Sequence, residues 1–193
     1  MRARTIALII AIFITGTLGA QNRWALKSNL LHDATASVNL SLEYSPFAHW
    51  SVELSGSVNM WDLPHGLMLK HAIVQPEVKY WLCDRFNGWF FDVHAFGGYI
   101  PIIGGLPLDF SKYHDKFPNL STFNMRKGIF AGGGIGFGYD FILGRHWNLE
   151  LEMGVGYMYL RGNEYSGDVL ILKNSKFDYL GPTKLGVTIC YLF

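Results

Sequence analysis

An alternation of apolar and polar residues recurs along this chain, and it constrains the fold more than any other feature. Residues 50–60 give the clearest example, with Trp50 and Val52 on one face and Ser51 and Glu53 on the other. Successive side chains of a β-strand point to opposite faces. The alternation therefore predicts an all-β chain whose strands separate an apolar from a polar environment.

Eight such segments follow one another, most of them about 9–11 residues long, the length that a tilted strand needs to cross a bilayer. They cover residues 24–30, 38–44, 50–60, 72–82, 89–99, 129–141, 147–159 and 185–193. The connections alternate between short (45–49, 83–88, 143–146) and long (62–70, 101–127, 161–175); only 32–36 departs from this trend. Short turns on one rim and long loops on the other are typical of outer-membrane barrels. We predict an eight-stranded antiparallel transmembrane β-barrel in the cell outer membrane of a Gram-negative bacterium.

The first 20 residues predict export. Arg2 and Arg4 precede an uncharged apolar run at 6–14 and a stretch of mostly small residues. This order is typical of a secretory signal peptide, with cleavage before Gln21 or after Gly19. The run is too short for a membrane-spanning helix, which needs about 20 apolar residues. We therefore expect a signal peptide at 1–20 and a single barrel domain at 21–193.

The volume of the lumen indicates which face looks outward. An eight-stranded barrel is only wide enough for side chains to fill its interior. The apolar face carries bulky residues and the other face mainly Gly, Ser and Asn, so the apolar face is predicted to point to lipid. Aromatic residues gather where strands begin or end, as expected for girdles at the two membrane interfaces. They are Trp50, Trp89, Trp147, Tyr44, Tyr80, Phe141 and Phe193 at the short-turn rim, and Trp61, Tyr99 and Tyr159 at the other.

Charged residues fall on the inward face and need partners there. The predicted lumen network consists of Lys27, Glu43, Glu53, Glu77, Lys79, Asp92, His94, Glu150, Glu152 and Lys184. We interpret it as a polar plug whose ion pairs fix the strand register. A proton or ion path is the alternative, although eight-stranded lumens are filled by side chains.

Motifs for catalysis, cofactors or metals are not found. The chain has no His-Glu-x-x-His and no Cys-x-x-Cys, and its net charge of +1 gives no basic surface for nucleic acid. His49 and Ser51 could suggest a hydrolase pair, but strand parity points Ser51 into the lumen. The same parity turns Cys83 and Cys190 inward on strands four and eight. Two free, buried cysteines are expected, with a disulfide as the alternative.

Several motifs together resemble a known family. They are Ala-Leu-Lys-Ser-Asn-Leu-Leu-His-Asp-Ala-Thr at 25–35, Gln-Pro-Glu-Val-Lys-Tyr-Trp-Leu-Cys at 75–83, Ile-Leu-Gly-Arg-His-Trp-Asn-Leu-Glu at 142–150 and Gly-Pro-Thr-Lys at 181–184. The chain resembles a Bacteroidetes family of small outer-membrane barrel proteins catalogued as a domain of unknown function. The resemblance implies an outer-membrane location and supplies no activity, cofactor or catalytic residue. Members are often encoded near fimbrial and surface-assembly proteins, which implies a role in surface assembly or adhesion.

The expected function is therefore non-enzymatic, structural or surface-binding. Candidate contacts to a surface or fimbrial protein are Phe110, Tyr113, Phe117 and Phe123, in the connection at 101–127; packing of these rings onto the barrel mouth is the alternative. Tyr191 and Phe193 resemble the signal read by the barrel insertion machinery. This machinery and outer-membrane lipid are the other expected partners. The competing functions are an outer-membrane lipid-modifying enzyme and a soluble periplasmic barrel that binds an apolar ligand.

Overall fold

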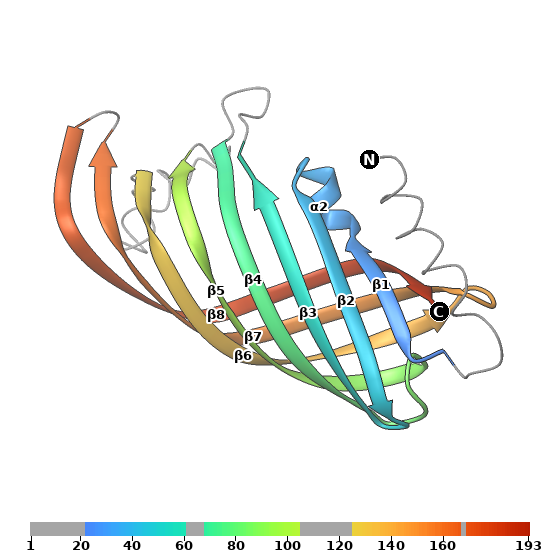
Figure 1. Ribbon diagram of the computed structural model, residues 1–193. Coiled ribbons are helices and arrows are strands. Elements are labelled where there is room, and N and C mark those ends of the chain that lie inside the picture. The colour runs from blue at the N-terminus through green and yellow to red at the C-terminus, as the bar shows by residue number, and fades with distance from the viewer. Residues whose placement is uncertain (1–21, 61–67, 105–124, 167–168) are drawn as a thin grey trace, which may run out of the picture.

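The computed structural model describes residues 22–60, 68–104, 125–166 and 169–193. Its strands are antiparallel and close into a barrel in chain order, so that the last strand pairs with the first (Figure 1). The elements are β1 (Trp24–Asn29), α2 (Leu30–Ala34), β2 (Val38–Phe47), β3 (Trp50–Asn59), β4 (Met68–Trp81), β5 (Gly88–Gly104), β6 (Met125–Ile142), β7 (Trp147–Ser166) and β8 (Val169–Leu192). The predicted all-β, eight-stranded antiparallel barrel is confirmed. Within the described ranges, no helix is long and apolar enough to cross a membrane.

The chain between residues 161 and 175 forms strand, so the long loop predicted there is wrong. β7 continues to Ser166 and β8 begins at Val169. The ladder between them passes through register shifts on both sides of Glu164. Such shifts interrupt the period-two alternation on which the prediction relied. The connections predicted at 62–70 and 101–127 are shortened by the same kind of strand extension.

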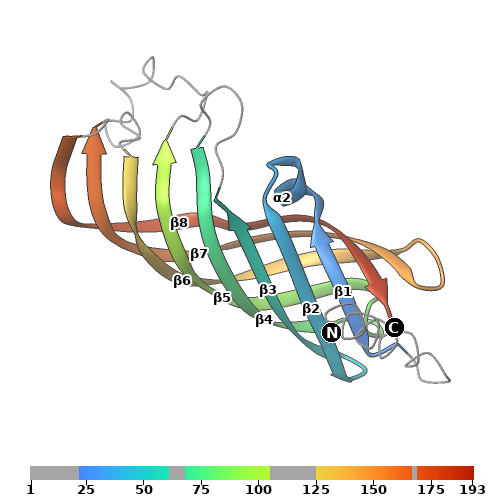
Figure 2. The same ribbon diagram turned by 45° about the horizontal axis from the view of Figure 1, so that its top comes forward.

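The strands of the barrel differ greatly in length. β1 has 6 residues, β4 has 14 and β8 has 24. As a result, the ends of β7 and β8 reach well past α2, which follows β1 (Figure 2). The wall is therefore low on the side of β1 and high on the side of β8.

Burial alternates along the strands as the volume argument predicts. On β3, Trp50, Val52 and Leu54 are exposed, whereas Ser51 and Asn59 are fully buried. The same division holds around the barrel, with bulky apolar side chains outside and most polar side chains inside. The apolar face of the sheet is the outer face.

The rim where β1 begins and β8 ends, here called the terminal rim, has a ring of aromatic pairs. Each pair joins a Trp of an odd-numbered strand to the directly opposed Tyr of the next strand. The pairs and their centroid distances are Trp24–Tyr44 (4.5 Å), Trp50–Tyr80 (4.9 Å), Trp89–Tyr139 (5.0 Å) and Trp147–Tyr191 (5.1 Å). Trp61, expected in the girdle of the opposite, outer rim, lies outside the described residues. The predicted clustering of aromatics at the terminal rim is confirmed.

Some large apolar side chains lie inside the barrel, on the face that was expected to carry mainly Gly, Ser and Asn. Trp81, Phe86 and Phe90 pack together in one cluster. Glycine on the neighbouring strand makes room for the rings: a Cβ atom at Gly138 would lie 2.8 Å from Cε1 of Phe90 and 2.5 Å from the backbone oxygen of Leu151. The glycine repeat of β6 therefore accommodates bulky rings in a narrow lumen.

Candidate functional site

Lys27 of β1 lies at the centre of the lumen network and is fully buried. Its Nζ atom is 2.7 Å from Oε2 of Glu150 and 3.1 Å from Oε2 of Glu53, and it also pairs with Glu43. These three carboxylates come from β7, β3 and β2. One ammonium group thereby links four strands across the lumen.

Lys79 of β4 makes a second hub beside the first. Its Nζ atom lies 2.6 Å from Oε1 of Glu150, 3.1 Å from Oε2 of Glu53 and 3.4 Å from Oε1 of Glu77. The same atom lies 4.5 Å from the centroid of the Phe90 ring. Glu150 and Glu53 thus bridge the two buried lysines.

Lys184 of β8 extends the network toward the outer rim. It pairs with Glu77 and, at 2.6 Å, with Oε1 of Glu152. In this network five carboxylates face three ammonium groups, an excess of two negative charges if all are ionised. The ion pairs compensate part of this buried charge, while Oε2 of Glu43 and Oε1 of Glu77 accept no hydrogen bond.

Asp92 and His94 lie on β5 next to the network. His94 Nδ1 is 2.7 Å from Oδ1 of Asp92, and its Nε2 is 3.0 Å from Oγ1 of Thr183. Ligand atoms of Glu77, Asp92 and His94 lie within 4.8 Å of one another, a spacing that could hold a metal ion. Both ring nitrogens of His94 already have partners, whereas Oε1 of Glu77 and Oδ2 of Asp92 accept no hydrogen bond. The structure thus brings all ten predicted lumen residues into one interior.

His49 and Ser51 do not form a hydrolase pair. His49 Nδ1 is 3.0 Å from the backbone oxygen of Trp81. Ser51 is buried in the lumen, where its hydroxyl donates to Glu43 and accepts a 2.8 Å hydrogen bond from Nε1 of Trp81. Sequence reasoning missed this Glu43–Ser51–Trp81 chain because it assigned Trp81 to no face.

The two cysteines are free, and the alternative of a disulfide is not observed. Cys190 is buried as expected, but Cys83 is exposed. The predicted inward orientation of Cys83 is wrong because β4 ends at Trp81, so that strand parity no longer applies in the turn. The predicted loop contacts Phe110, Tyr113, Phe117 and Phe123 lie outside the described residues.

The C-terminal aromatic residues complete the seam of the barrel. The ring centroids of Tyr191 and Phe193 lie 6.3 Å apart. The Phe193 amide donates to the Trp24 oxygen at 3.0 Å, and the Trp24 amide donates to the Phe193 oxygen at 3.2 Å. The residues of the predicted assembly signal thus lie where β8 is bonded to β1, and their role in assembly stays a prediction.

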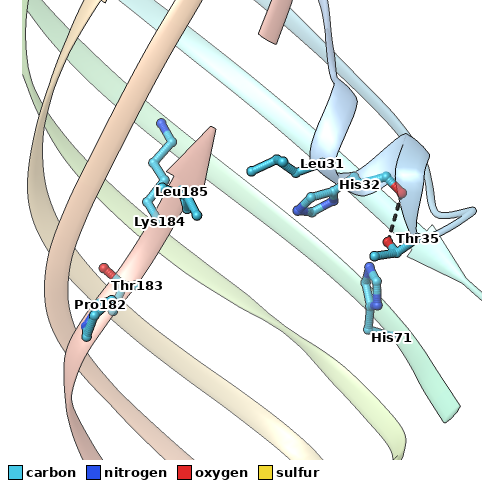
Figure 3. Close-up of a pocket in the computed structure, with 8 residues that line it drawn as sticks. All are labelled: Leu31, His32, Thr35, His71, Pro182, Thr183, Lys184 and Leu185. Carbon is cyan, nitrogen blue, oxygen red and sulfur yellow. Dashed lines mark hydrogen bonds between the residues drawn. The ribbon is translucent and has the colours of Figure 1, made fainter. Parts of the chain in front are cut away.

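A pocket opens between α2 and β8, and sequence reasoning missed it. It has a volume of about 430 Å³ and is lined by Leu31, His32, Thr35, His71, Pro182, Thr183, Lys184 and Leu185. Figure 3 shows the lining residues in two groups that face each other, one from α2 and β4 and the other from β8. The pocket depends on the bend of the chain into α2, which no alternation pattern predicts.

Ser57 lies between two histidines near this pocket. His32 Nδ1 is 2.8 Å from Oγ of Ser57, and His71 Nε2 is 3.0 Å from the same oxygen. Because a hydroxyl carries one proton, Ser57 can donate to one imidazole and must accept from the other. The inward parity of Ser57 was a signal for this arrangement, but His71 fell just outside the predicted strand at 72–82.

The comparisons with known proteins give one match. A family described as "Protein of unknown function (DUF3575)" matches residues 5–193. No curated protein matches the chain. No solved structure matches it either.

Proposed function

The chain belongs to the family described as "Protein of unknown function (DUF3575)", and from this premise we propose that it is a non-enzymatic β-barrel of the cell outer membrane. The single observation that carries the proposal is the apolar outer surface of a closed barrel. Val93, Ile129 and Ile135, for example, are 63%, 63% and 62% exposed. A continuous apolar surface of this kind would promote aggregation in water and is suited to lipid.

The terminal rim supports the same proposal. The four Trp–Tyr pairs form a ring around the barrel near the terminal rim. Amphipathic rings favour the headgroup region of a bilayer. A soluble barrel with an apolar ligand inside is not supported, because an ion network and packed rings fill the lumen and most bulky apolar residues point outward.

The role that we assign to the barrel is structural or surface-binding. Charged side chains and rings fill the interior, so the proposal includes no channel. Contacts with a surface or fimbrial protein are assigned to the connection between β5 and β6, whose sequence includes the candidate aromatic contacts. Deleting residues 107–120 should abolish capture of that partner and leave assembly intact; unchanged capture would count against this role.

A charge introduced on the outer face tests the membrane location. Val93 lies between the rim residue Trp89 and Tyr99, so Val93→Arg would place a charge in the lipid. Such a charge costs about 2–4 kcal/mol near the bilayer midplane. We expect Val93→Arg to reduce the heat-dependent gel-mobility shift and the yield in the outer-membrane fraction. Gly144→Arg is the control, because Gly144 lies in a turn where a Cβ atom would meet nothing within 4 Å.

Equal assembly of both arginine variants would contradict the membrane location, since the exposed site of Val93 would tolerate arginine in water. Wild-type protein that stays soluble and shows no mobility shift would contradict it as well.

A second candidate, an outer-membrane lipid-modifying enzyme, is favoured by one observation. Ser57 has histidine nitrogens at 2.8 and 3.0 Å, as a nucleophile beside a base would. Its test is lipid hydrolysis or acyl transfer by the purified barrel, lost in Ser57→Ala. Absence of any turnover in the wild-type protein would leave the non-enzymatic role standing.

A further inference from the structure

The barrel wall is interrupted between β8 and β1. Their ladder covers Ala25–Asn29 of β1 and ends at Thr188 on β8. Farther out, β8 pairs with β7 alone among the residues that the structure describes, and these pairs continue to Val169. The free edge of β8 is therefore far longer than the edge that β1 covers.

The interruption begins at a depth that the proposed membrane would cover. A tilted transmembrane strand needs about 9–11 residues, but β1 has 6. Leu30 follows the rim residue Trp24 by six positions, and Leu185 precedes the rim residue Tyr191 by six. Leu30 and Leu185 are 42% and 62% exposed, so the apolar surface continues on both sides of the gap.

The short helix α2 only partly covers the edge of β8. Asn29 caps α2 through a 3.0 Å bond from the Leu31 amide, and its Nδ2 donates to the Leu185 oxygen at 3.3 Å. Backbone that leaves regular structure at membrane depth is tolerated where it lines a polar or water-filled cavity. The pocket of about 430 Å³ lies at this place (Figure 3).

The lining of the pocket is divided by polarity. Leu31, Pro182 and Leu185 are apolar, whereas His32, Thr35, His71, Thr183 and Lys184 carry hydrogen-bond donors. Two of these already have acceptors: Thr35 donates to the His32 oxygen, and Lys184 pairs with Glu77 and Glu152. None of these eight lining residues is acidic. Such a lining suits a ligand with an acceptor-rich, anionic head group and an apolar tail.

The lumen closes behind the pocket. Lys184 lines the pocket and also pairs with Glu77 and Glu152 of the ion network. A head group that enters from the side would therefore reach Lys184 and stop at the plug.

We propose that the gap between α2 and β8 is a lateral opening through which an anionic lipid of the outer leaflet places its head group in the pocket. The acyl chains remain outside, against Leu30 and Leu185. The head group and its bound water supply partners for the free edge of β8, which would otherwise face hydrocarbon. This inference rests on the proposed outer-membrane location.

The test uses the full barrel in dodecyl maltoside micelles, with dodecyl phosphate as the probe. Binding is measured by titration calorimetry and by native mass spectrometry. We expect one dodecyl phosphate per barrel, and binding at least about tenfold weaker in the His32→Gln/His71→Gln double variant, the loss expected if about 1.4 kcal/mol of head-group contacts are removed. Thr35→Trp, which fills the pocket, should abolish binding.

The matched control is the His49→Gln/His146→Gln double variant. These two histidines lie near the terminal rim, and each ring bonds to a backbone oxygen at 3.0 Å. This control should bind dodecyl phosphate as the wild type does. Equal binding by wild type and both pocket variants would overturn the proposal.

Two further outcomes bear on the source of the ligand and on the premise. Inorganic phosphate that binds as tightly as dodecyl phosphate would overturn the lipid assignment in favour of a free anion. A barrel that shifts with heat and fractionates with the outer membrane, but binds no dodecyl phosphate, would overturn the opening alone. A soluble protein without the mobility shift would overturn the proposed function itself.

Discussion

Replacing Lys79 by Met tests whether the lumen network stabilises the barrel. Met has a similar length and no charge, and the change leaves the five carboxylates around Lys79 with less compensation. Three of them have oxygens within 3.4 Å of Nζ, and Lys79 is completely buried. Removing one partner of a buried ion pair costs about 3–5 kcal/mol, because the remaining charge is left uncompensated. The ratio of folded to unfolded protein should therefore fall by roughly two to more than three orders of magnitude.

The assay is equilibrium unfolding by guanidinium of barrels inserted in phospholipid vesicles, followed by tryptophan fluorescence. Glu150→Gln and the Lys79→Met/Glu150→Gln double variant complete a thermodynamic cycle. Lys79 Nζ and Glu150 Oε1 lie 2.6 Å apart, so the two changes should not be additive. The double variant should lose about 0.5–3 kcal/mol less than the sum of the single losses.

Lys176→Met is the control, since Lys176 is exposed on β8. It should change the free energy of unfolding by no more than about 0.5 kcal/mol. If Lys79→Met is equally mild, or if the cycle is additive, the network does not stabilise the fold and the reasoning fails.

Three further predictions concern packing, closure and orientation. Gly138→Ala should destabilise the barrel by about 1–3 kcal/mol in the same unfolding assay, because a buried ring and a backbone oxygen occupy the space. Gly56→Ala, where a Cβ atom would meet nothing within 4 Å, should have a free energy of unfolding within about 0.5 kcal/mol of wild type. Equal losses in the two variants would refute the packing argument. Deleting Phe193 should reduce outer-membrane assembly more than Phe193→Ala, which keeps the backbone bonds to β1; normal assembly of both would contradict the role of the C-terminal residue. A membrane-impermeant maleimide should label Cys83 only after the outer membrane is permeabilised, and Cys190 only after unfolding; labelling of Cys83 on intact cells would place the terminal rim outside the cell.

Much of the barrel could be predicted because one physical rule governs it. Alternation predicted the number of strands and the orientation of residues such as Val52 and Ser51, since each side chain has only two faces to choose from. The lumen set, including Lys27 and Glu150, followed from the same parity. The ion-pair partners within this set could not be predicted, because they depend on the shear of the barrel.

The features that the sequence did not predict lie where the rule breaks. The register shifts around Glu164 concealed the outer parts of β7 and β8. The end of β4 at Trp81 turned Cys83 outward, and the turn into α2 created the pocket beside His32. Bulges, strand ends and short helices are set by local backbone geometry, which an alternation pattern does not record.

The graded strand lengths have a consequence for the order of folding. Strands that follow one another along the chain can begin to pair at the turn that connects them. The β1–β8 ladder, in contrast, joins residues more than 150 positions apart and has five residue pairs. Such a contact carries a large loop-closure entropy and few bonds to offset it. The β1–β8 seam should therefore form last during insertion, and its amides should exchange with solvent deuterium sooner than those in the middle of the β6–β7 ladder. The barrel would thus close only when β8, its longest strand, pairs with β1, its shortest.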